Sequence, residues 1–303
     1  MTEKLLKVSP APHFKFSEKI NTLMLDVIIA LLPAAGAGIY FYGMDAVKIM
    51  ATAIICSVGS EFLWNLLLKK KQTIGDLSAV VTGLVLSLIL PTYVPLWIPA
   101  IGAIFAIIVV KQFFGGLGQN FMNPSAAAKV FLIAAWAGVM AKPVVDTVAS
   151  ASKSAAKVTP TLWEIFVGQA QGNIGETSML ALVIGGVYLL CRRTISLRIP
   201  VSFLATTTIM SYVITRKGFF MGDPIDGLLV GAIVLAAIFM ATDYASSPMT
   251  PVGQIIFGIG CGIFTMVFKV YGYNPDGPFY AIILMNLFAP LIEYFTTPKR
   301  KEV

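Results

Sequence analysis

Residues 76–91 read DLSAVVTGLVLSLILP, an apolar run that opens on an aspartate and closes on a proline. A helix needs about 20 mostly apolar residues to span roughly 30 Å of hydrocarbon, so this run is short for a membrane span. Its internal glycine, Gly83, suits close packing or a broken helix more than a lipid-facing span. Residues 225–242 repeat the pattern, with Asp226 near the start and Gly231 inside. We interpret both runs as short helices packed among full-length spans.

The rest of the chain is equally apolar. Of its 303 residues, 57% are hydrophobic and only 12% are charged, and the mean hydropathy is +0.83. Soluble domains average roughly 25% charged residues, so the composition excludes a soluble globular protein and predicts an all-α polytopic membrane protein. Ten apolar segments are expected, at approximately 21–42, 45–68, 76–91, 94–113, 124–141, 178–195, 199–215, 225–242, 250–270 and 278–296.

The positive charges indicate the orientation. With ten spans, fourteen Lys and Arg residues, Lys111 among them, fall on one side and seven on the other, and Lys129 lies inside a span. The richer side is cytoplasmic by the positive-inside rule, so both termini are expected there, and the net charge of +7 is a topology signal rather than a nucleic-acid patch. The expected organisation is a cytoplasmic arm at 1–20, a first five-helix half at 21–141, an external loop at 142–177, a second five-helix half at 178–296 and a cytoplasmic tail at 297–303.

The order of features in the two halves is similar. A short aspartate-led segment, a longer span, a Gly/Asn/Pro element and a final apolar helix occur at 76–141 and again at 226–296. Five spans per half is an odd number, so the second half would enter the membrane from the opposite side. This arrangement is an inverted repeat, in which broken helices build sites at the interface of the halves. Chance agreement between apolar segments is the alternative explanation.

The Gly/Asn/Pro element of the first half, residues 115–128, is the first candidate binding site. Glycines such as Gly118 let a bulky planar ligand such as an isoalloxazine approach the backbone, and Asn120 and Asn123 offer amide donors and acceptors for its edge. Pro124 then opens a helix at a favoured first-turn position. A helix connection rich in turn formers would explain the glycines and the proline but not the two amides.

The external loop carries the second candidate. Asp146, Ser150 and Ser152 lie in the stretch DTVASAS at 146–152. An aspartate, small residues and a terminal hydroxyl at this spacing are typical of the sequence at which a flavin-attaching enzyme esterifies FMN to Ser or Thr. A flexible Ser/Ala loop is the alternative interpretation.

Charged residues within apolar segments are costly and tend to be paired or functional. Asp243 is the candidate for an ion path, because it ends the short segment 225–242 just before a Ser246-Ser247-Pro248 break, where exposed carbonyls help to ligate Na+. The other candidates are Asp26, Glu61, Asp76, Lys129 and Glu293.

Other chemistries find no support in the sequence. Cys56, Cys191 and Cys261 lie far apart, and His13 is the single histidine, so no metal site or iron–sulfur cluster is expected. No GxGxxG fingerprint opens a βαβ unit, so NAD(H) is expected to bind elsewhere. No cleavable signal peptide precedes the first helix, which is expected to stay in the mature chain.

Taken together, four stretches resemble one known family. They are residues 8–13 (VSPAPH), Gly118 to Ala128, Gly172 to Ser178 and Asn274-Pro275. The chain is similar over essentially its whole length to the family of Rnf D subunits and of B subunits of the sodium-translocating NADH:quinone reductase. The resemblance implies a fold of ten spans like that of urea channels, built from two inverted five-helix halves.

The resemblance also implies the cofactors. The family carries FMN in phosphoester linkage to a hydroxyl of the external loop, and its motif matches Asp146, Ser150 and Ser152, with Ser152 as the acceptor. Ala149 stands where the family has a hydroxyl and Ser152 where threonine is commoner, so Thr159 is the second choice. The asparagine pair that accompanies a non-covalent riboflavin in related members matches Asn120 and Asn123 in spacing.

The implied activity is that of a membrane subunit in an ion-translocating ferredoxin:NAD+ oxidoreductase complex of the prokaryotic cell membrane. Electrons would pass from a neighbouring flavoprotein subunit to the external FMN, then toward a cytoplasmic NADH-binding subunit, and drive export of Na+ or H+. The implied partners are these and other Rnf membrane and peripheral subunits, a flavin transferase for maturation, and membrane lipid. The alternatives are a small-solute channel or secondary transporter, which an inverted repeat equally permits, and a scaffold that anchors redox partners.

Overall fold

The computed structural model describes residues 20–140, 166, 172–215, 218–222, 231–272 and 276–297. This part of the chain is mostly helical, with one small antiparallel hairpin of β1 (Ile214–Thr215) and β2 (Gly218–Phe219). The predicted all-α class is therefore confirmed for the described residues.

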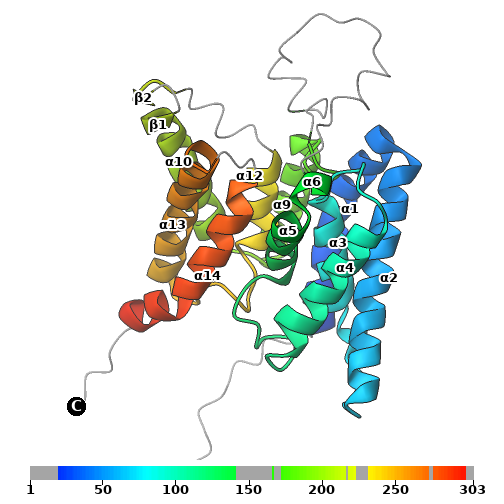
Figure 1. Cartoon of the computed structure of the whole chain (residues 1–303). Helices are drawn as coiled ribbons and strands as arrows, with labels where there is room; N and C mark the ends of the chain where they lie inside the picture. Colours follow the sequence, from blue (N-terminus) through cyan, green and yellow to red (C-terminus); the bar gives the residue numbers. More distant parts are fainter. Residues whose placement is uncertain are drawn as a thin grey trace, which may run out of the picture.

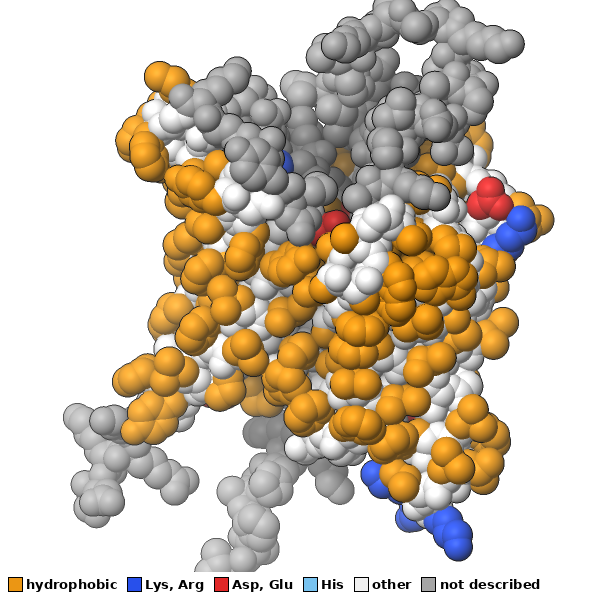
Figure 2. Space-filling model, viewed as in Figure 1, with side chains coloured by type: hydrophobic (Ala, Val, Ile, Leu, Met, Phe, Trp, Pro, Cys, Tyr) orange, Lys and Arg blue, Asp and Glu red, His pale blue; other side chains and the backbone are white. Residues whose placement is uncertain are grey.

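Four helices are long and apolar enough to cross a membrane. They are α1 (Ile20–Tyr42), α2 (Met44–Leu67), α13 (Pro251–Val270) and α14 (Gly277–Thr296). In Figure 1, α1 and α2 lie at one side of the molecule and α13 and α14 at the other, with α5 (Pro124–Ala135), α9 (Met179–Cys191) and α12 (Gly231–Leu235) between them and α10 (Arg198–Val213) beside α13. Figure 2 shows hydrophobic side chains over most of the visible flank, as a surface that faces lipid requires.

The remaining helical segments are shorter. They are η1 (Ile74–Asp76), α3 (Ser78–Leu88), α4 (Trp97–Ile104), η2 (Phe105–Gln112), α5 (Pro124–Ala135), α6 (Ala137–Met140), α9 (Met179–Cys191), α10 (Arg198–Val213), α12 (Gly231–Leu235) and η3 (Ala236–Met240). Every apolar range expected from the sequence contains helix in the described residues, and α3 is short, as predicted, whereas the first residues of the range 225–242 lie outside the described part of the chain. Ten crossings and the inverted repeat stay predictions, and Asp226 lies outside the described residues.

Helix α3 ends inside the protein, where its last carbonyls need partners. The backbone N–H groups of Ile174 and Gly175 donate to Leu90 O and Leu88 O at 3.1 and 2.7 Å. The ammonium group of Lys129 in α5 donates to Ile89 O at 2.8 Å. No water replaces these bonds in hydrocarbon, so a helix that stops at membrane depth is stable only where other protein segments supply the missing donors.

Helix α5 begins inside the protein and is capped in the same way. Asn123 is its N-cap, with Oδ1 accepting from the N–H groups of Ser125 and Ala126 at 3.1 Å, and Pro124 takes the first position, as predicted. The Asn123 amide also donates to Met240 O, the last residue of η3, at 3.2 Å. One side chain therefore joins the start of α5 to the end of η3.

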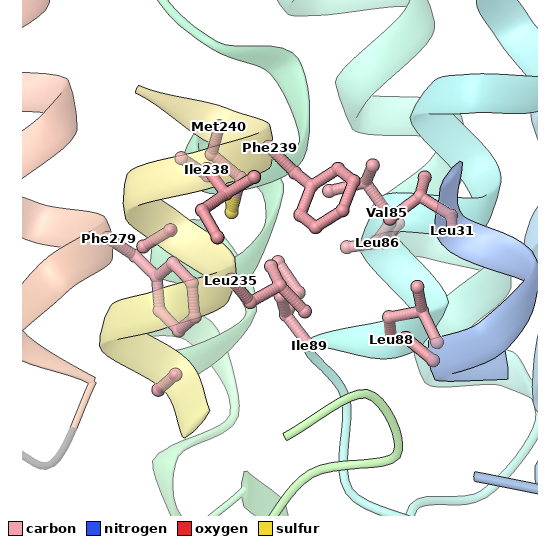
Figure 3. Packing of buried hydrophobic residues seen from close by; sticks show 14 of the residues in the cluster. Leu31, Val85, Leu86, Leu88, Ile89, Leu235, Ile238, Phe239, Met240 and Phe279 are labelled. Atoms are coloured by element: carbon pink, nitrogen blue, oxygen red, sulfur yellow. The ribbon is translucent and has the colours of Figure 1, made fainter. Parts of the chain in front are cut away.

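The apolar core lies between these short helices. Figure 3 shows Phe239 of η3 pointing toward Val85 and Leu86 of α3, and Leu235 of α12 lying near Ile89. These side chains are buried, and α1 and α14 contribute further members of the cluster. Lipid is as apolar as leucine, so the close fit of these groups, rather than their removal from water, holds the helices together.

The fit between α2 and α3 depends on Gly83. A Cβ atom on Gly83 would lie 2.8 Å from the Cα of Ile54 and 2.9 Å from Ala53 O, closer than van der Waals contact. We expect Gly83→Ala to force the two helices apart and to lower the free energy of unfolding by about 1–3 kcal/mol, as overpacking does elsewhere.

Thermal unfolding of the full chain in mild detergent measures the effect of Gly83→Ala. The matched control is Gly59→Ala in α2, where an added Cβ meets nothing within 4 Å; it should stabilise the helix by about 0.5–1 kcal/mol. Equal midpoints for the two variants would contradict the packing argument.

Candidate functional site

A cavity lies where α1, α3, the end of η2, the start of α5 and η3 meet; we call it the central cavity. Three of the predicted residues, Asn120, Asn123 and Asp243, line it together. Gly118 lies in the same loop, at a φ of +86° that favours glycine. The wall also includes Lys111 at the end of η2. Both π-helical segments, η2 and η3, lead into the cavity, and such segments are common at functional sites.

The walls of the central cavity are apolar and its polar groups lie together. Val81, Val85, Ile238 and Phe239 supply flat or branched apolar surfaces, and Ser78, Lys111, Asn120 and Asp243 supply donors and acceptors. An apolar cleft with a few placed polar groups is the usual form of a small-molecule site. A planar heteroaromatic ring with polar atoms on one edge fits this set of residues.

The two asparagines are already engaged. Asn123 uses its amide for the cap of α5 and for Met240 O, and Asn286 of α14 accepts from its backbone N–H at 2.9 Å when the Asn286 amide is oriented to satisfy its neighbours. Asn120 donates to Met122 O at 3.2 Å and hydrogen-bonds the Asp243 carboxylate. Asn123 therefore holds the cavity wall, and of the two asparagines Asn120 is the one whose amide meets a charged group of the cavity.

Asp243 is half-buried near the start of the loop that follows η3. Its carboxylate accepts from the hydroxyl of Ser246 at 3.0 Å and from the N–H of Ala245 at 3.4 Å. Burial raises the pKa of Asp243 above its ordinary value, and the hydrogen bonds from Ser246, Ala245 and Asn120 partly offset this.

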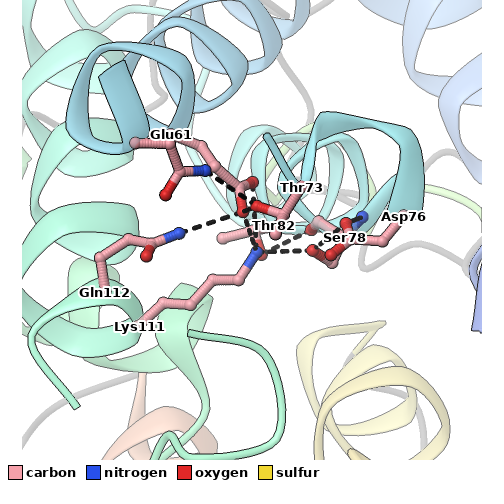
Figure 4. A network of polar contacts seen from close by, with 8 residues as sticks. Glu61, Thr73, Asp76, Ser78, Thr82, Lys111 and Gln112 are labelled. Carbon is pink, nitrogen blue, oxygen red and sulfur yellow. Dashed lines mark hydrogen bonds and ion pairs between the residues drawn. The ribbon is translucent and has the colours of Figure 1, made fainter. Parts of the chain in front are cut away.

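Lys111 pairs with Glu61 of α2 beside the central cavity (Figure 4). Its ammonium nitrogen lies 3.2 Å from each carboxylate oxygen of Glu61, and the two side chains are 2% and 1% exposed. Gln112 and Thr73 donate to the same carboxylate at 3.0 and 2.6 Å. The assignment of Lys111 to a cytoplasmic loop was therefore wrong, because this lysine is a buried counter-ion rather than a topology signal.

Asp76 and Ser78 complete the network at the start of α3. The Asp76 carboxylate accepts from the N–H and the hydroxyl of Ser78 at 2.8 and 2.6 Å, and Lys111 donates to the Ser78 oxygen at 2.5 Å. The aspartate that opens the segment 76–91 therefore orders the start of α3 and, through Ser78, the position of the lysine ammonium.

A second polar cluster surrounds the inner end of α3. Lys129 lies 3.3 Å from an Asp276 carboxylate oxygen, and Glu176 accepts from the amide of Asn173 at 2.7 Å. Burial raises the pKa of Glu176 to about 7, although the nearby Lys129 opposes the shift. Ser178 caps the start of α9, where its hydroxyl oxygen accepts from the N–H of Ala181 at 3.3 Å. The 172–178 element is therefore a structural connection between the halves.

The predicted attachment residues, Asp146, Ser150, Ser152 and Thr159, lie outside the described residues. The sequence reasoning missed Lys111 and Phe239 as cavity residues. Lys111 had a usable signal, a cation within the last turns of an apolar run, and Glu61 had been recognised as a charge inside a span. No sequence signal marks Phe239, because single aromatic residues are common in apolar segments.

The fold and the cavity define a polytopic α-helical membrane protein with a partly polar cavity between interrupted helices. Residues 7–302 match the NQR2, RnfD, RnfE family, and the chain belongs to this family. The resemblance inferred from the sequence motifs is confirmed.

Three relatives cover almost the whole chain. It is 45% identical to the D subunit of the Na(+)-translocating ferredoxin:NAD(+) oxidoreductase complex of Acetobacterium woodii, over 98% of this chain and 95% of the relative. It is 36% identical to the D subunit of the proton-translocating ferredoxin:NAD(+) oxidoreductase complex of Clostridium ljungdahlii, over 98% and 96%. It is also 36% identical to the D subunit of the ion-translocating oxidoreductase complex of Methanosarcina acetivorans, over 96% of each.

The Glu61–Lys111 pair makes a sharp prediction about stability. Lys111→Met leaves a buried carboxylate without its counter-charge, so we expect the free energy of unfolding to fall by about 3–5 kcal/mol. Lys111→Met combined with Glu61→Gln removes both charges and should recover most of that loss. A double-mutant cycle of thermal or chemical unfolding measures the coupling, and strictly additive effects would show that the two groups do not interact.

Proposed function

We propose that this chain is the D subunit of an ion-translocating ferredoxin:NAD+ oxidoreductase complex of the prokaryotic cell membrane, with both termini in the cytoplasm. The observation that carries the proposal is the 45% identity to such a subunit over 98% of the chain. The relative from Acetobacterium woodii is named for Na+ translocation and the one from Clostridium ljungdahlii for proton translocation. The complex of this chain would export one of these two ions. Partner subunits would bring electrons to this chain and receive them from it.

The proposal includes two flavin sites. Ser152 would hold FMN by a phosphoester bond in the external loop, with Asp146 and Ser150 as part of the sequence that a flavin transferase modifies. The central cavity would hold a second, non-covalent flavin such as riboflavin. Bound flavin supplies one- and two-electron redox chemistry, which the protein controls through distance, burial and hydrogen bonding.

The residues of the central cavity suit these tasks. Phe239, Val85 and Ile238 would cover the faces of a planar ring and exclude water. Asn120 and Asp243 would hydrogen-bond its edge, the amide of Asn120 as donor or acceptor and the carboxylate of Asp243 as acceptor. Lys111, held by Glu61 and Ser78, would place one ammonium group at the ring without leaving a net buried charge.

The apolar packing beyond the cavity favours this proposal over a solute channel. Leu86, Leu88, Ile89 and Leu235 are essentially unexposed and fill the space between α3 and α12. A pore for a polar solute needs a continuous row of hydrogen-bonding groups or a water-filled path, and these buried apolar side chains provide neither.

Attachment of FMN is tested by in-gel fluorescence of the denatured full chain, co-expressed with a flavin transferase. We expect a fluorescent band from the wild type, no band from Ser152→Ala and an unchanged band from the control Ser154→Ala, a hydroxyl that lies just outside the motif at 146–152. Loss of the band only in Thr159→Ala would move the acceptor to Thr159. A dark wild-type band, with only the unmodified mass for residues 142–177, would refute covalent attachment.

The non-covalent site is tested by acid extraction of flavin from the purified, non-denatured complex, followed by chromatography. Asn120→Ala should lower the extractable flavin per chain, with a loss of affinity of about tenfold from one lost hydrogen bond to a buried polar edge. The exposed neighbour Gln119 provides the matched control, Gln119→Ala. Release of no flavin from the wild type, or equal release from both variants, would contradict a flavin in the central cavity.

A further inference from the structure

A second pocket adjoins the central cavity at the end of the molecule where α9 stops and α10 and α13 begin; we call it the arginine pocket. Its walls include Arg193, Thr194, Ser196, Tyr244, Ser247 and Gln254. It shares Thr194 and Tyr244 with the wall of the central cavity. Three helix ends meet here at the face expected to be cytoplasmic, so we expect the pocket at the level of the lipid headgroups rather than of the hydrocarbon.

The pocket carries positive charge that the described residues do not neutralise. Three arginines occur within seven residues, at 192, 193 and 198. Arg192 lies 3.1 Å from Asp26, and Arg198 donates to Gln254 Oε1 at 3.4 Å. Arg193 forms no ion pair within the described part of the chain, and its side chain is exposed at the pocket. One guanidinium group is therefore available to a ligand.

Thr194 provides the second, independent observation. Its side chain is 3% exposed, and its hydroxyl has no hydrogen-bond partner among the described residues. The neighbouring hydroxyls are satisfied, since Ser196 donates to Gln254 Oε1 at 2.9 Å and Ser247 donates to Asp243 O at 2.7 Å. A buried hydroxyl without a partner is unfavourable. A ligand oxygen that enters the pocket would remove this defect.

The surroundings indicate what kind of ligand carries that oxygen. Exposed apolar side chains flank the pocket, namely Leu197, Val201, Met249 and Val252. An acyl chain can lie on such a surface while its headgroup reaches the arginine. The planar guanidinium group binds phosphate oxygens with two parallel hydrogen bonds, and basic pockets between membrane helices at this level bind acidic headgroups.

We propose that the arginine pocket binds the phosphate group of an anionic phospholipid, with Arg193 and the Thr194 hydroxyl as its donors. This site adjoins the proposed flavin site of the central cavity, with which it shares Thr194 and Tyr244, but Arg193 belongs to the arginine pocket alone. The bound headgroup would fill the space between the α9–α10 connection and the loop before α13, next to Tyr244 of the central cavity.

Native mass spectrometry of the full chain in its detergent-purified complex tests the proposal. The probes are dioleoyl phosphatidylglycerol, dioleoyl phosphatidylcholine and inorganic phosphate. We expect retention of one phosphatidylglycerol in preference to phosphatidylcholine, and weaker retention by about five- to tenfold in Arg193→Gln and in Thr194→Val. The matched control is Lys70→Gln, an exposed cation expected on the same face but away from the pocket, which should bind like the wild type.

Thr194→Val also separates binding from folding. The Thr194 hydroxyl has no partner in the described protein, so its replacement by a methyl group should leave the unfolding temperature of lipid-free protein unchanged or higher. Equal retention of the two lipids, or unchanged retention in both pocket variants, would overturn the proposal. Binding of inorganic phosphate with no retained lipid would overturn the lipid assignment and make the ligand a soluble phosphate.

Discussion

Every backbone N–H and C=O group in the hydrocarbon region must find its partner inside the protein, and the rest of this structure depends on that constraint. Helices α3 and η3 stop, and α5 starts, within the molecule. They are tolerated because other segments complete their hydrogen bonds. Lys129 and the N–H groups of Ile174 and Gly175 serve the end of α3, and Asn123 serves both the start of α5 and the end of η3.

The central cavity is a consequence of these interruptions. Where helices stop, side chains leave the regular packing and polar groups can be held at membrane depth. The cost of charge there is reduced by pairing, which explains why Lys111 is found with Glu61 and Lys129 with Asp276. The apolar cluster around Leu86 and Leu235 separates the cavity from the second polar cluster. A redox group needs such a closed, partly polar environment, whereas a permeating solute needs an open path.

The same residues therefore serve stability and function. Asn123 was expected to contact a ligand, but its amide is committed to two helix ends, so its contribution to a ligand site is the shape of the wall. Asn120 and Asp243 remain directed at one another and at the cavity. The arginine pocket also forms where helices end, here at the face expected to be cytoplasmic. Its Thr194 hydroxyl has no hydrogen-bond partner among the described residues.

Hydropathy by itself determined where the helices lie, because the preference of a segment for lipid is a sum over neighbouring residues. The short character of α3, the helix start at Pro124 and the membrane class followed from this local property. Only the tertiary structure decided which charges meet. Glu61 and Lys111 are 50 positions apart and Asn123 and Met240 are 117 apart. Such contacts depend on how helices cross, and the crossing is set by the complementary shapes of many side chains rather than by any one segment.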